Sequence, residues 1–199
     1  MDILPLLDEL QTIARNGLTY SNNPYDQERY QRLLKLVSSY YGQTIDIPAA
    51  DIQRRFQAEL GYITPKVGAD AAIFNDVGQI LLMQRADNGQ WCLPCGWVDP
   101  SESPAEAAVR ETKEECGLDV KVIKLVDVFT RKPSLELGPH TMVAVVYICE
   151  VTGGELQLSH EGLALKYCWI DEVEDWHGLH HQYARAAHSV WQELQANIA

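Results

Sequence analysis

The chain has 199 residues, enough for one domain with a substantial core or for one domain and a small helical annex. Its 16 Lys and Arg residues against 28 Asp and Glu residues give a net charge of −12. This charge disfavours extended binding to nucleic acids or acidic membranes, because both require a basic surface. The N-terminus lacks the basic segment of a signal peptide, no apolar run approaches membrane-spanning length, and five cysteines, an odd number, fit reduced thiols. We therefore expect a cytoplasmic protein that does not contact membranes.

Residues 1–62 are predicted to form a small helical domain. Apolar residues recur at helical spacing from Ile3 to Ile13, from Tyr30 to Tyr40 and from Ile52 to Leu60, and Gly61 ends the last of these segments. About three short amphipathic helices cannot bury much apolar surface alone. They must pack on the following domain or on a second copy of themselves, and we favour a homodimer.

From Lys66 onward the apolar period changes from that of helices to that of strands, which places a second domain at residues 66–199. Strands are expected at residues 69–74 and 80–83, joined by a turn at residues 75–78. Arg85 follows the second of these strands.

Cys92 and Cys95 are spaced as in a thioredoxin redox motif. That chemistry needs the first cysteine at the N-terminus of a helix, where the helix dipole lowers the thiol pKa. Here Pro94 and Gly96 stand where such a helix would begin, and helix-start signals appear only at Ser103. We expect no redox role, and one Cys-x-x-Cys pair without a second pair is weak evidence for zinc.

A helix is predicted from Ser103 to Gly117. The serine can cap the free amides, Pro104 suits the first helical position, and Glu106 can reach back to complete a capping box. Gly117 suits the left-handed residue that ends a helix.

Glu111, Glu114 and Glu115 share one face of this helix, because they are spaced at i, i+3 and i+4. Glutamate-rich helix faces are usually solvated surface, and a Glu-Glu pair alone would favour that interpretation. Three like charges on one stripe repel each other, however, and a cation would relieve the repulsion. Hard oxygen ligands at this density suit Mg²⁺ or Mn²⁺. Glu102, just before the cap, could reach the same region.

The complete pattern runs as Gly96, five residues, Glu102, seven residues, Arg110-Glu111, two residues, Glu114-Glu115, one residue and Gly117. This pattern closely resembles the signature of the Nudix hydrolases, and the resemblance extends more weakly over residues 66–175. It implies an α+β fold, a Nudix-type α/β/α sandwich with a mixed sheet, here preceded by the small helical N-terminal domain. It also implies a pyrophosphohydrolase that acts on phosphorus-containing anhydrides.

The resemblance implies a role for each box residue. Glu111 and Glu115 would be the principal metal ligands, with Glu114 assisting and Glu102 as a further candidate. Arg110 would orient the glutamates through charged hydrogen bonds rather than touch the substrate. Family members commonly supply another glutamate from the region near Glu161, either to the metals or to activate water. The predicted catalytic set is therefore Glu115, Glu114, Arg110 and Glu161.

Candidate substrate-binding residues lie outside the box. The arginine of family members that corresponds to Arg85 often faces the substrate phosphates or supports the glutamates; a surface arginine at a strand end is an equally good account of the spacing. Arg131, Lys132 and His140 form a basic cluster on a predicted loop of an acidic chain. That cluster could bind diphosphate oxygens or a substrate head group, or it could be a solvated loop.

The remaining elements are expected as follows. Strands are predicted at residues 120–130, 141–151 and 163–170, with a turn at Gly153-Gly154, and a helix at residues 179–198 is predicted to cover the sheet. Four histidines lie in or next to this last helix: His177, His180, His181 and His188. We interpret them as surface histidines rather than a metal site.

The expected reaction is Mg²⁺-dependent cleavage of a nucleoside diphosphate linked to another group X, giving a nucleoside monophosphate and X-phosphate. The resemblance to family members with a helical front end favours ADP-ribose or CDP-alcohols such as CDP-choline as substrates. Two alternatives stay open: an RNA-end or nucleotide-processing hydrolase, and a non-catalytic nucleotide-sensing module. The expected partners are a small nucleotide and a second copy of the chain.

Overall fold

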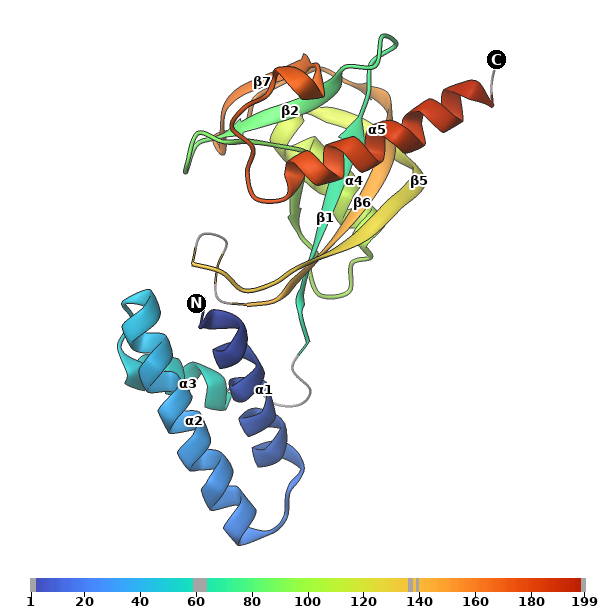
Figure 1. Cartoon of the computed structure of the whole chain (residues 1–199). Helices are drawn as coiled ribbons and strands as arrows, with labels where there is room; N and C mark the ends of the chain where they lie inside the picture. The colour runs from blue at the N-terminus through green and yellow to red at the C-terminus, as the bar shows by residue number, and fades with distance from the viewer. Residues whose placement is uncertain (1–2, 59–63, 136–137, 139, 198–199) are drawn as a thin grey trace. The chain divides into compact units, whose positions relative to one another are not determined.

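The structure, a computed structural model, describes residues 3–58, 64–135, 138 and 140–197 (Figure 1). The chain divides into two compact units. One comprises Met1–Lys66 together with Lys132–Met142, and the other comprises Val67–Arg131 and Val143–Ala199. The predicted boundary near residue 62 lies outside the described residues, between residues 58 and 64. The sequence did not predict that residues 132–142 belong to the helical unit.

The helical unit contains α1 (Leu4–Tyr20), α2 (Pro24–Ile45) and α3 (Ala49–Ala58). This confirms three helices; the predicted end at Gly61 lies outside the described residues. The side chain of Asn23 caps α2 by accepting a hydrogen bond from the backbone N–H of Tyr25 at 2.9 Å. The apolar stripes of the three helices meet in one core, built from Leu4, Leu7, Ala14, Leu34, Val37, Tyr41, Ile52 and Phe56.

The second unit contains two sheets. One has the strand order β4-β1-β6-β5, and the other has the order β3-β2-β7. The strands are β1 (Lys66–Ile73), β2 (Ile80–Arg85), β3 (Trp91–Cys92), β4 (Cys95–Trp97), β5 (Leu118–Arg131), β6 (Met142–Gly154) and β7 (Gly162–Cys168). The predicted strands are thus present. The expected turn at Gly153-Gly154 is wrong, because β6 continues through both glycines.

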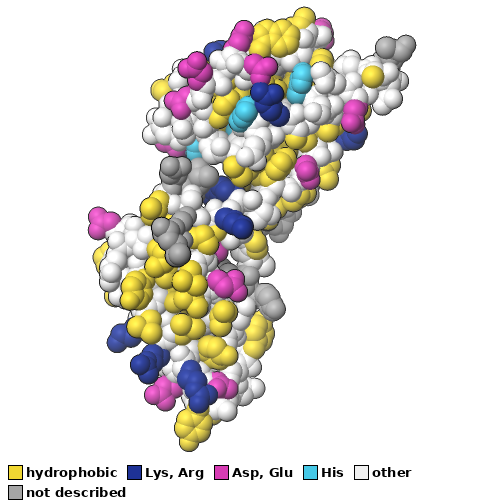
Figure 2. Space-filling model, in the orientation of Figure 1, with side chains coloured by type: hydrophobic (Ala, Val, Ile, Leu, Met, Phe, Trp, Pro, Cys, Tyr) yellow, Lys and Arg dark blue, Asp and Glu magenta, His cyan; other side chains and the backbone are white. Residues whose placement is uncertain are grey.

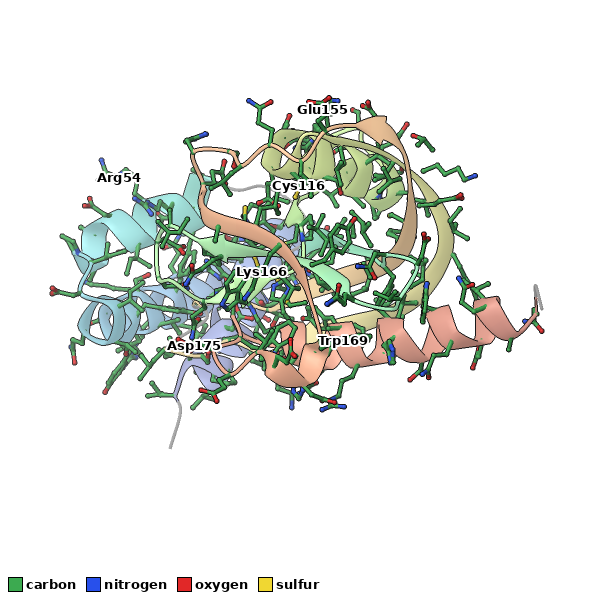
Figure 3. The ribbon with its side chains drawn as sticks, turned by 90° about the horizontal axis from the view of Figure 1, so that it is seen from above. Arg54, Cys116, Glu155, Lys166, Trp169 and Asp175 are labelled. Atoms are coloured by element: carbon green, nitrogen blue, oxygen red, sulfur yellow. The ribbon has the colours of Figure 1, made fainter. Side chains whose placement is uncertain are left out.

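Helix α4 (Pro104–Cys116) and helix α5 (His180–Ala196) lie on opposite sides of the strands, as Figures 1 and 3 show. A 3₁₀ turn at Ile170–Glu172 precedes α5. The capping box of Ser103 and Glu106 is formed, and Gly117 closes α4 with φ +75°. The predicted limits of this helix are therefore confirmed, and so is the α+β sandwich.

Helix α4 is fixed against the sheet by small residues on its buried face. Ala107, Ala108 and Cys116 have no exposed surface, and they pack against β1 residues such as Ala71 and Ile73. Small side chains allow the helix to approach the strands closely, and a close-packed contact of this kind resists displacement. Glu111 and Glu115 lie beside these small residues on the inner side of α4, because they follow Ala107 and Ala108 at spacings of four and seven residues, so the packing also fixes their positions against β4.

Candidate active site

Glu115 is the most deeply buried carboxylate of α4, with a relative exposure of 4%. Its Oε2 accepts a hydrogen bond of 2.9 Å from the backbone N–H of Cys95. The pKa of Glu115 is raised to about 8, mainly by burial and also by the negative charges of Glu111 and Glu161, against the opposing effects of the Cys95 hydrogen bond and the cation of Arg85. A carboxylate in such a position is stabilised by any cation that enters beside it.

Glu111 lies one helical turn before Glu115 and packs directly over Gly96 of β4. A Cβ atom built on Gly96 would collide with the carboxylate of Glu111, so a larger residue here would displace that side chain. Burial also raises the pKa of Glu111, against the effect of Arg110. The first glycine of the sequence pattern is therefore explained by the space that the Glu111 carboxylate occupies.

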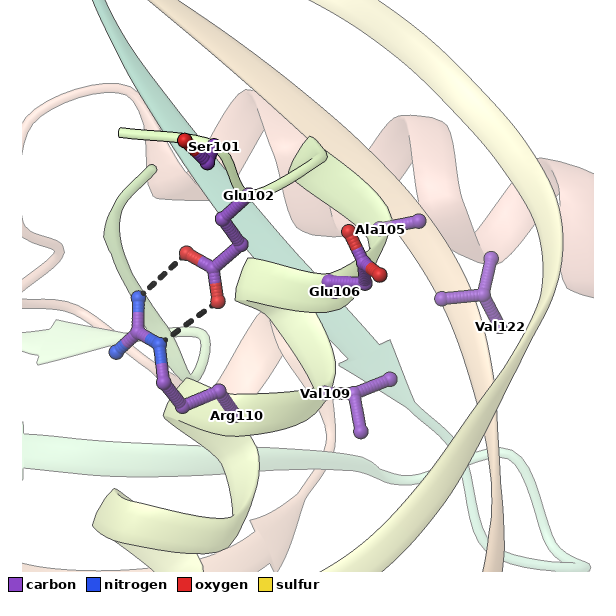
Figure 4. A pocket seen from close by; sticks show the side chains of 7 residues that line it. All are labelled: Ser101, Glu102, Ala105, Glu106, Val109, Arg110 and Val122. Carbon is purple, nitrogen blue, oxygen red and sulfur yellow. Dashed lines mark hydrogen bonds and ion pairs between the residues drawn. The ribbon is translucent and has the colours of Figure 1, made fainter. Parts of the chain in front are cut away.

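Arg110 connects the acidic side chains of α4 (Figure 4). Its Nε and Nη2 donate to the two carboxylate oxygens of Glu102 at 2.8 and 2.9 Å, and its Nη1 donates to Glu111 at 2.8 Å and to Glu114 at 3.1 Å. Nη2 also donates to the carbonyl of Trp97 at 3.0 Å. Both oxygens of Glu102 are thus engaged by one guanidinium, whereas Glu111 has one oxygen in such a contact.

The pairing with Arg110 keeps Glu102 ionised. Hydrogen bonding to Arg110 lowers the pKa of Glu102 below its usual value. The same two side chains line an open hollow of about 630 Å³ at the start of α4, together with Ser101, Ala105, Glu106, Val109 and Val122 (Figure 4).

Glu161 belongs to the loop between β6 and β7, which packs on the C-terminal end of α4. The backbone N–H of Ser159 donates to the carbonyl of Glu115 at 3.2 Å, and the carbonyl of Glu161 accepts from Ala86 at 2.8 Å. The Glu161 side chain remains 63% exposed, and its charge raises the pKa values of both Glu111 and Glu115. The structure therefore brings Glu161 into the electrostatic field of the box glutamates.

Arg85 lies at the end of β2, on the side of the molecule where its charge reaches Glu115. A bidentate pair with Asp87, at 2.9 and 2.7 Å, fixes its guanidinium. The hydrogen bond with Asp87 raises the pKa of Arg85. A fixed cation near an acidic site can hold anionic oxygens of a substrate.

Arg131 and His140, which the sequence groups in one basic cluster, fall in different units. Arg131 ends β5, its Nε is buried without a hydrogen-bond partner among the described residues, and burial lowers its pKa. His140 belongs to the helical unit, where its Nδ1 lies 3.5 Å from Oδ1 of Asp8.

The oxygen donors that converge here suit a hard divalent cation. Glu111 and Glu115 share one face of α4. Glu161 adds a third carboxylate, and its negative charge raises the pKa values of both. Glu114 is more remote, with a side chain 59% exposed and one contact to Arg110. Burial raises the pKa values of Glu111 and Glu115, and neighbouring carboxylates add to this effect, so a divalent cation beside them would stabilise their ionised forms.

The interpretation of the C-terminal histidines as surface residues is wrong for His180. This side chain opens α5 with a relative exposure of 6% and lies beside Asp70, which is 2% exposed. Burial lowers the pKa of His180 to about 3 and raises that of Asp70 to about 8. Together with Cys95, these residues form a buried polar cluster next to Glu115. No local signal could reveal it, since 25 and 85 residues separate its members.

The comparisons with known proteins agree with this geometry. Residues 64–188 match the NUDIX domain family, and residues 1–56 match a family described as a UDP-X-like, N-terminal oligomerisation domain. The chain is 34% identical to “Putative ADP-ribose pyrophosphatase YjhB” of Bacillus subtilis (strain 168) over 73% of this chain and 70% of the relative. It is 40% identical to an ADP-ribose pyrophosphatase of Methanocaldococcus jannaschii over 48% of this chain and 57% of that protein.

Solved structures of two pyrophosphate-cleaving enzymes also match this chain. A UDP-X diphosphatase matches with a TM-score of 0.56 and 25% identity, covering 99% of this chain and 97% of that one. An ADP-ribose pyrophosphatase from Streptococcus suis 89-1591 matches with a TM-score of 0.54 and 29% identity, covering 64% of this chain and 92% of that one.

The fold, the arranged glutamates and these matches define an enzyme class that hydrolyses phosphorus-containing anhydrides. The chain belongs to the Nudix hydrolase family, whose members generally use divalent metal ions. None of the helices in the described part of the chain is long and apolar enough to span a bilayer.

Proposed function

We propose that this protein is a Mg²⁺-dependent hydrolase of small nucleoside diphosphates linked to a group X, such as ADP-ribose or CDP-choline. The products are a nucleoside monophosphate and X-phosphate. The proposal rests mainly on one observation. Glu111, Glu115 and Glu161 are close enough for their negative charges to raise the pKa values of Glu111 and Glu115, and the fixed cation of Arg85 also acts on Glu115. An acidic site of this kind repels a diphosphate unless a cation lies between them.

Glu111 and Glu115 are the principal residues that would hold the metal, with Glu114 and Glu102 in supporting positions. When bound, Mg²⁺ supplies charge neutralisation of the diphosphate and lowers the pKa of a bound water. Arg110 holds the carboxylates in place through its hydrogen bonds to Glu102 and Glu111. Arg110 is thus a positioning residue rather than a substrate ligand.

Glu161 is the residue that we assign to proton transfer from the attacking water, because its carboxylate is exposed at the edge of the site. Arg85 stabilises negative charge on the departing phosphate, since its guanidinium is already oriented by Asp87. Arg131 offers a buried N–H donor without a partner among the described side chains, which fits a contact to substrate oxygen. His140 faces Asp8 in the helical unit, and the proposed chemistry does not depend on it.

A small NDP-X substrate is favoured by the relatives. The proteins named above carry the descriptions ADP-ribose pyrophosphatase and UDP-X diphosphatase, and the second matches both units of this chain. The net charge of −12 opposes extended contact with RNA. The nucleobase is therefore best tested with a panel that varies base and X independently.

The direct test is hydrolysis of ADP-ribose, CDP-choline, a UDP-linked sugar, a diadenosine polyphosphate and a nucleoside triphosphate in the presence of Mg²⁺. We expect monophosphate release from at least one NDP-X compound, loss of turnover when Mg²⁺ is chelated, and the highest kcat/KM within the NDP-X group. Reaction in ¹⁸O-labelled water then identifies the phosphorus that is attacked. Nucleotide binding without Mg²⁺-dependent release would show a sensing module instead, and preference for capped RNA over NDP-X would show an RNA-end hydrolase.

We also propose that the helical unit mediates homodimer formation in a reducing compartment such as the cytoplasm. Its sequence matches an oligomerisation domain. Large apolar side chains are exposed on α1 and α2, among them Leu6 (56%), Leu36 (52%) and Tyr40 (53%), and Figure 2 shows hydrophobic side chains gathered over the helices. All five cysteines are free thiols.

Sedimentation at micromolar concentration tests the homodimer. We expect a dimer for the wild-type chain and a shift towards monomer for Leu6→Lys or Leu36→Lys. Glu28→Lys, a charge change on the exposed surface of α2, is the matched control and should stay dimeric. A monomeric wild-type chain would contradict the homodimer but not the hydrolase.

A further inference from the structure

The buried cluster beside the active site contains three side chains that ligate soft divalent metals. Asp70 lies on β1, Cys95 opens β4 and His180 opens α5, and one potential ligand atom from each lies within 4.8 Å of the others. Asp70 and His180 are buried and Cys95 is partly exposed. A carboxylate, a thiol and an imidazole at this spacing form a donor set that differs from the all-carboxylate face of α4.

The contact between Asp70 and His180 is not satisfied by the protein. Nδ1 of His180 accepts a hydrogen bond from the backbone N–H of Leu93 at 3.2 Å, so this nitrogen carries a lone pair and no proton. Oδ1 of Asp70 lies 3.4 Å from the same nitrogen and has no hydrogen-bond partner among the described residues. Two acceptors therefore face each other in a buried position, and a cation or a shared proton is needed between them.

The distances suit a tetrahedral ion. With metal–nitrogen and metal–oxygen bonds of about 2.0–2.2 Å, two ligands of a tetrahedral Zn²⁺ lie about 3.4 Å apart. The observed Nδ1–Oδ1 distance is 3.4 Å. The sulfur of Cys95 would need to approach by at most about 1 Å, and the partial exposure of Cys95 provides an entry side for the ion.

Cys92 stands outside this group. Its thiol donates to the carbonyl of Met83 at 3.6 Å and interacts with that of Cys95, but the ligand atoms within 4.8 Å of one another belong to Asp70, Cys95 and His180. The two cysteines lie on the short strands β3 and β4, where no helix dipole lowers a thiol pKa, so redox chemistry is disfavoured here. A water molecule would supply the fourth ligand of a tetrahedral ion.

We propose that Asp70, Cys95 and His180 bind one Zn²⁺ ion, with a water molecule as the fourth ligand. The ion replaces the thiol proton of Cys95 and the carboxyl proton of Asp70, and both protons pass to solvent; His180 is already neutral. The ion takes the lone pair of Nδ1 from the Leu93 N–H, and the bonds from the metal to three side chains offset the loss of that one hydrogen bond.

Zinc at this position would be linked to the catalytic glutamates through the backbone. The N–H of Cys95 donates to Oε2 of Glu115, so an ion on the Cys95 sulfur restrains the residue that orients Glu115. The zinc site is nevertheless distinct from the Mg²⁺ site, because its ligands include sulfur and nitrogen. This difference in ligand chemistry allows the two sites to be tested separately.

Co²⁺ titration of the reduced, chelator-treated full-length protein tests the proposal. Excess Mg²⁺ is present throughout, so that the carboxylate site is occupied. We expect one equivalent of Co²⁺ to produce a near-ultraviolet thiolate-to-cobalt charge-transfer band and tetrahedral visible bands, and Zn²⁺ to displace the Co²⁺. Carboxylate ligands alone cannot produce the thiolate band. Its absence from the wild-type protein would overturn the proposal, whatever the hydrolase assay shows.

Variants assign the ligands. Cys95→Ser should abolish the thiolate band, Cys92→Ser should leave it in place, and His180→Gln or Asp70→Asn should keep the thiols but weaken Co²⁺ binding at least tenfold. Cys149→Ser, which removes a buried thiol of β6, is the matched control and should bind Co²⁺ as the wild type does. Circular dichroism checks that each variant is folded. A band that is unchanged in folded Cys95→Ser and His180→Gln would show that the ion binds elsewhere.

Discussion

The two ends of α4 treat their carboxylates in opposite ways. At the N-terminal end, both oxygens of Glu102 are bound by Arg110, and the pKa of Glu102 is lowered. At the C-terminal end, Glu115 is buried with a single backbone donor, and its pKa is raised to about 8. The negative charge of Glu102 is thus compensated by an arginine of the protein, whereas that of Glu115 requires an added cation. We therefore propose that Glu102 acts mainly in positioning and that Glu115 holds the metal.

Glu115→Gln should have the largest effect on activity. The amide retains the shape and the hydrogen bond from Cys95 but removes the charge that a metal needs. We expect kcat/KM to fall on the order of 10³-fold, about 4 kcal/mol, with a folded protein. Hydrolysis of the best NDP-X substrate measures the effect. Glu106→Gln, on the first turn of the same helix, retains the capping hydrogen bonds and should stay within about twofold of wild type; equal losses in both variants would contradict the assignment.

The stability of the folded protein should depend on pH through the buried carboxyls. Glu115 and Asp70 have folded-state pKa values of about 8, above the values of about 4 in an unfolded chain. Between these limits the folded state holds the protons and the unfolded state does not, so stability falls as the pH rises. His180 and His177 have lowered pKa values and act in the opposite direction, but only below the unfolded histidine pKa of about 6.5.

For the metal-free protein we therefore expect the free energy of unfolding to fall by on the order of 4 kcal/mol from pH 6.5 to pH 8.5, with about half of this from each carboxyl. Mg²⁺ should stabilise the protein more at pH 8.5 than at pH 6.5, because it binds the ionised form of Glu115. Urea unfolding with chelator and with Mg²⁺ measures both effects. Glu115→Gln should have a flatter profile, and a metal-free stability that rises across this window would show that these carboxyls are ionised in the folded state.

Gly96→Ala tests the middle of the helix, where Glu111 packs over β4. The added Cβ would meet the Glu111 carboxylate, so the side chain must leave its position. We expect kcat/KM to fall about 10–100-fold, with a smaller change in stability because a flexible side chain can move away. Gly153→Ala is the control, since its new Cβ would have its nearest contact at 3.5 Å and φ there is not positive. Full activity of Gly96→Ala would remove Glu111 from the site.

Glu102→Gln should have the smallest effect of the four. The amide can still accept one hydrogen bond from Arg110, and the contacts of Arg110 to Glu111 and Trp97 are unaffected. We expect a loss of about three- to tenfold in kcat/KM, mainly through looser positioning of Glu111. A loss as large as that of Glu115→Gln, together with weaker Mg²⁺ binding, would make Glu102 a direct metal ligand and end the distinction between the two ends of α4.

The glutamate site could be predicted from the sequence because its geometry is local. Ser103, Glu106 and Gly117 set the limits of α4, and the 3.6-residue period then places Glu111 and Glu115 on one face. The role of Gly96 required the structure, since the space over it is filled by a side chain from another element. The separation of His140 from Arg131 also required it, because the loop between them returns to the helical unit.

The family and the acidic helix could thus be predicted from the amino-acid sequence, since both depend on short-range spacing that the chain carries in any context. The tertiary structure alone decided which carboxylate is neutralised by an arginine and which is left buried, because burial and pKa depend on neighbours from other elements. It also decided that Asp70, Cys95 and His180 meet. Their contact arises from the packing of β1, β4 and α5, and no periodicity along the chain encodes it.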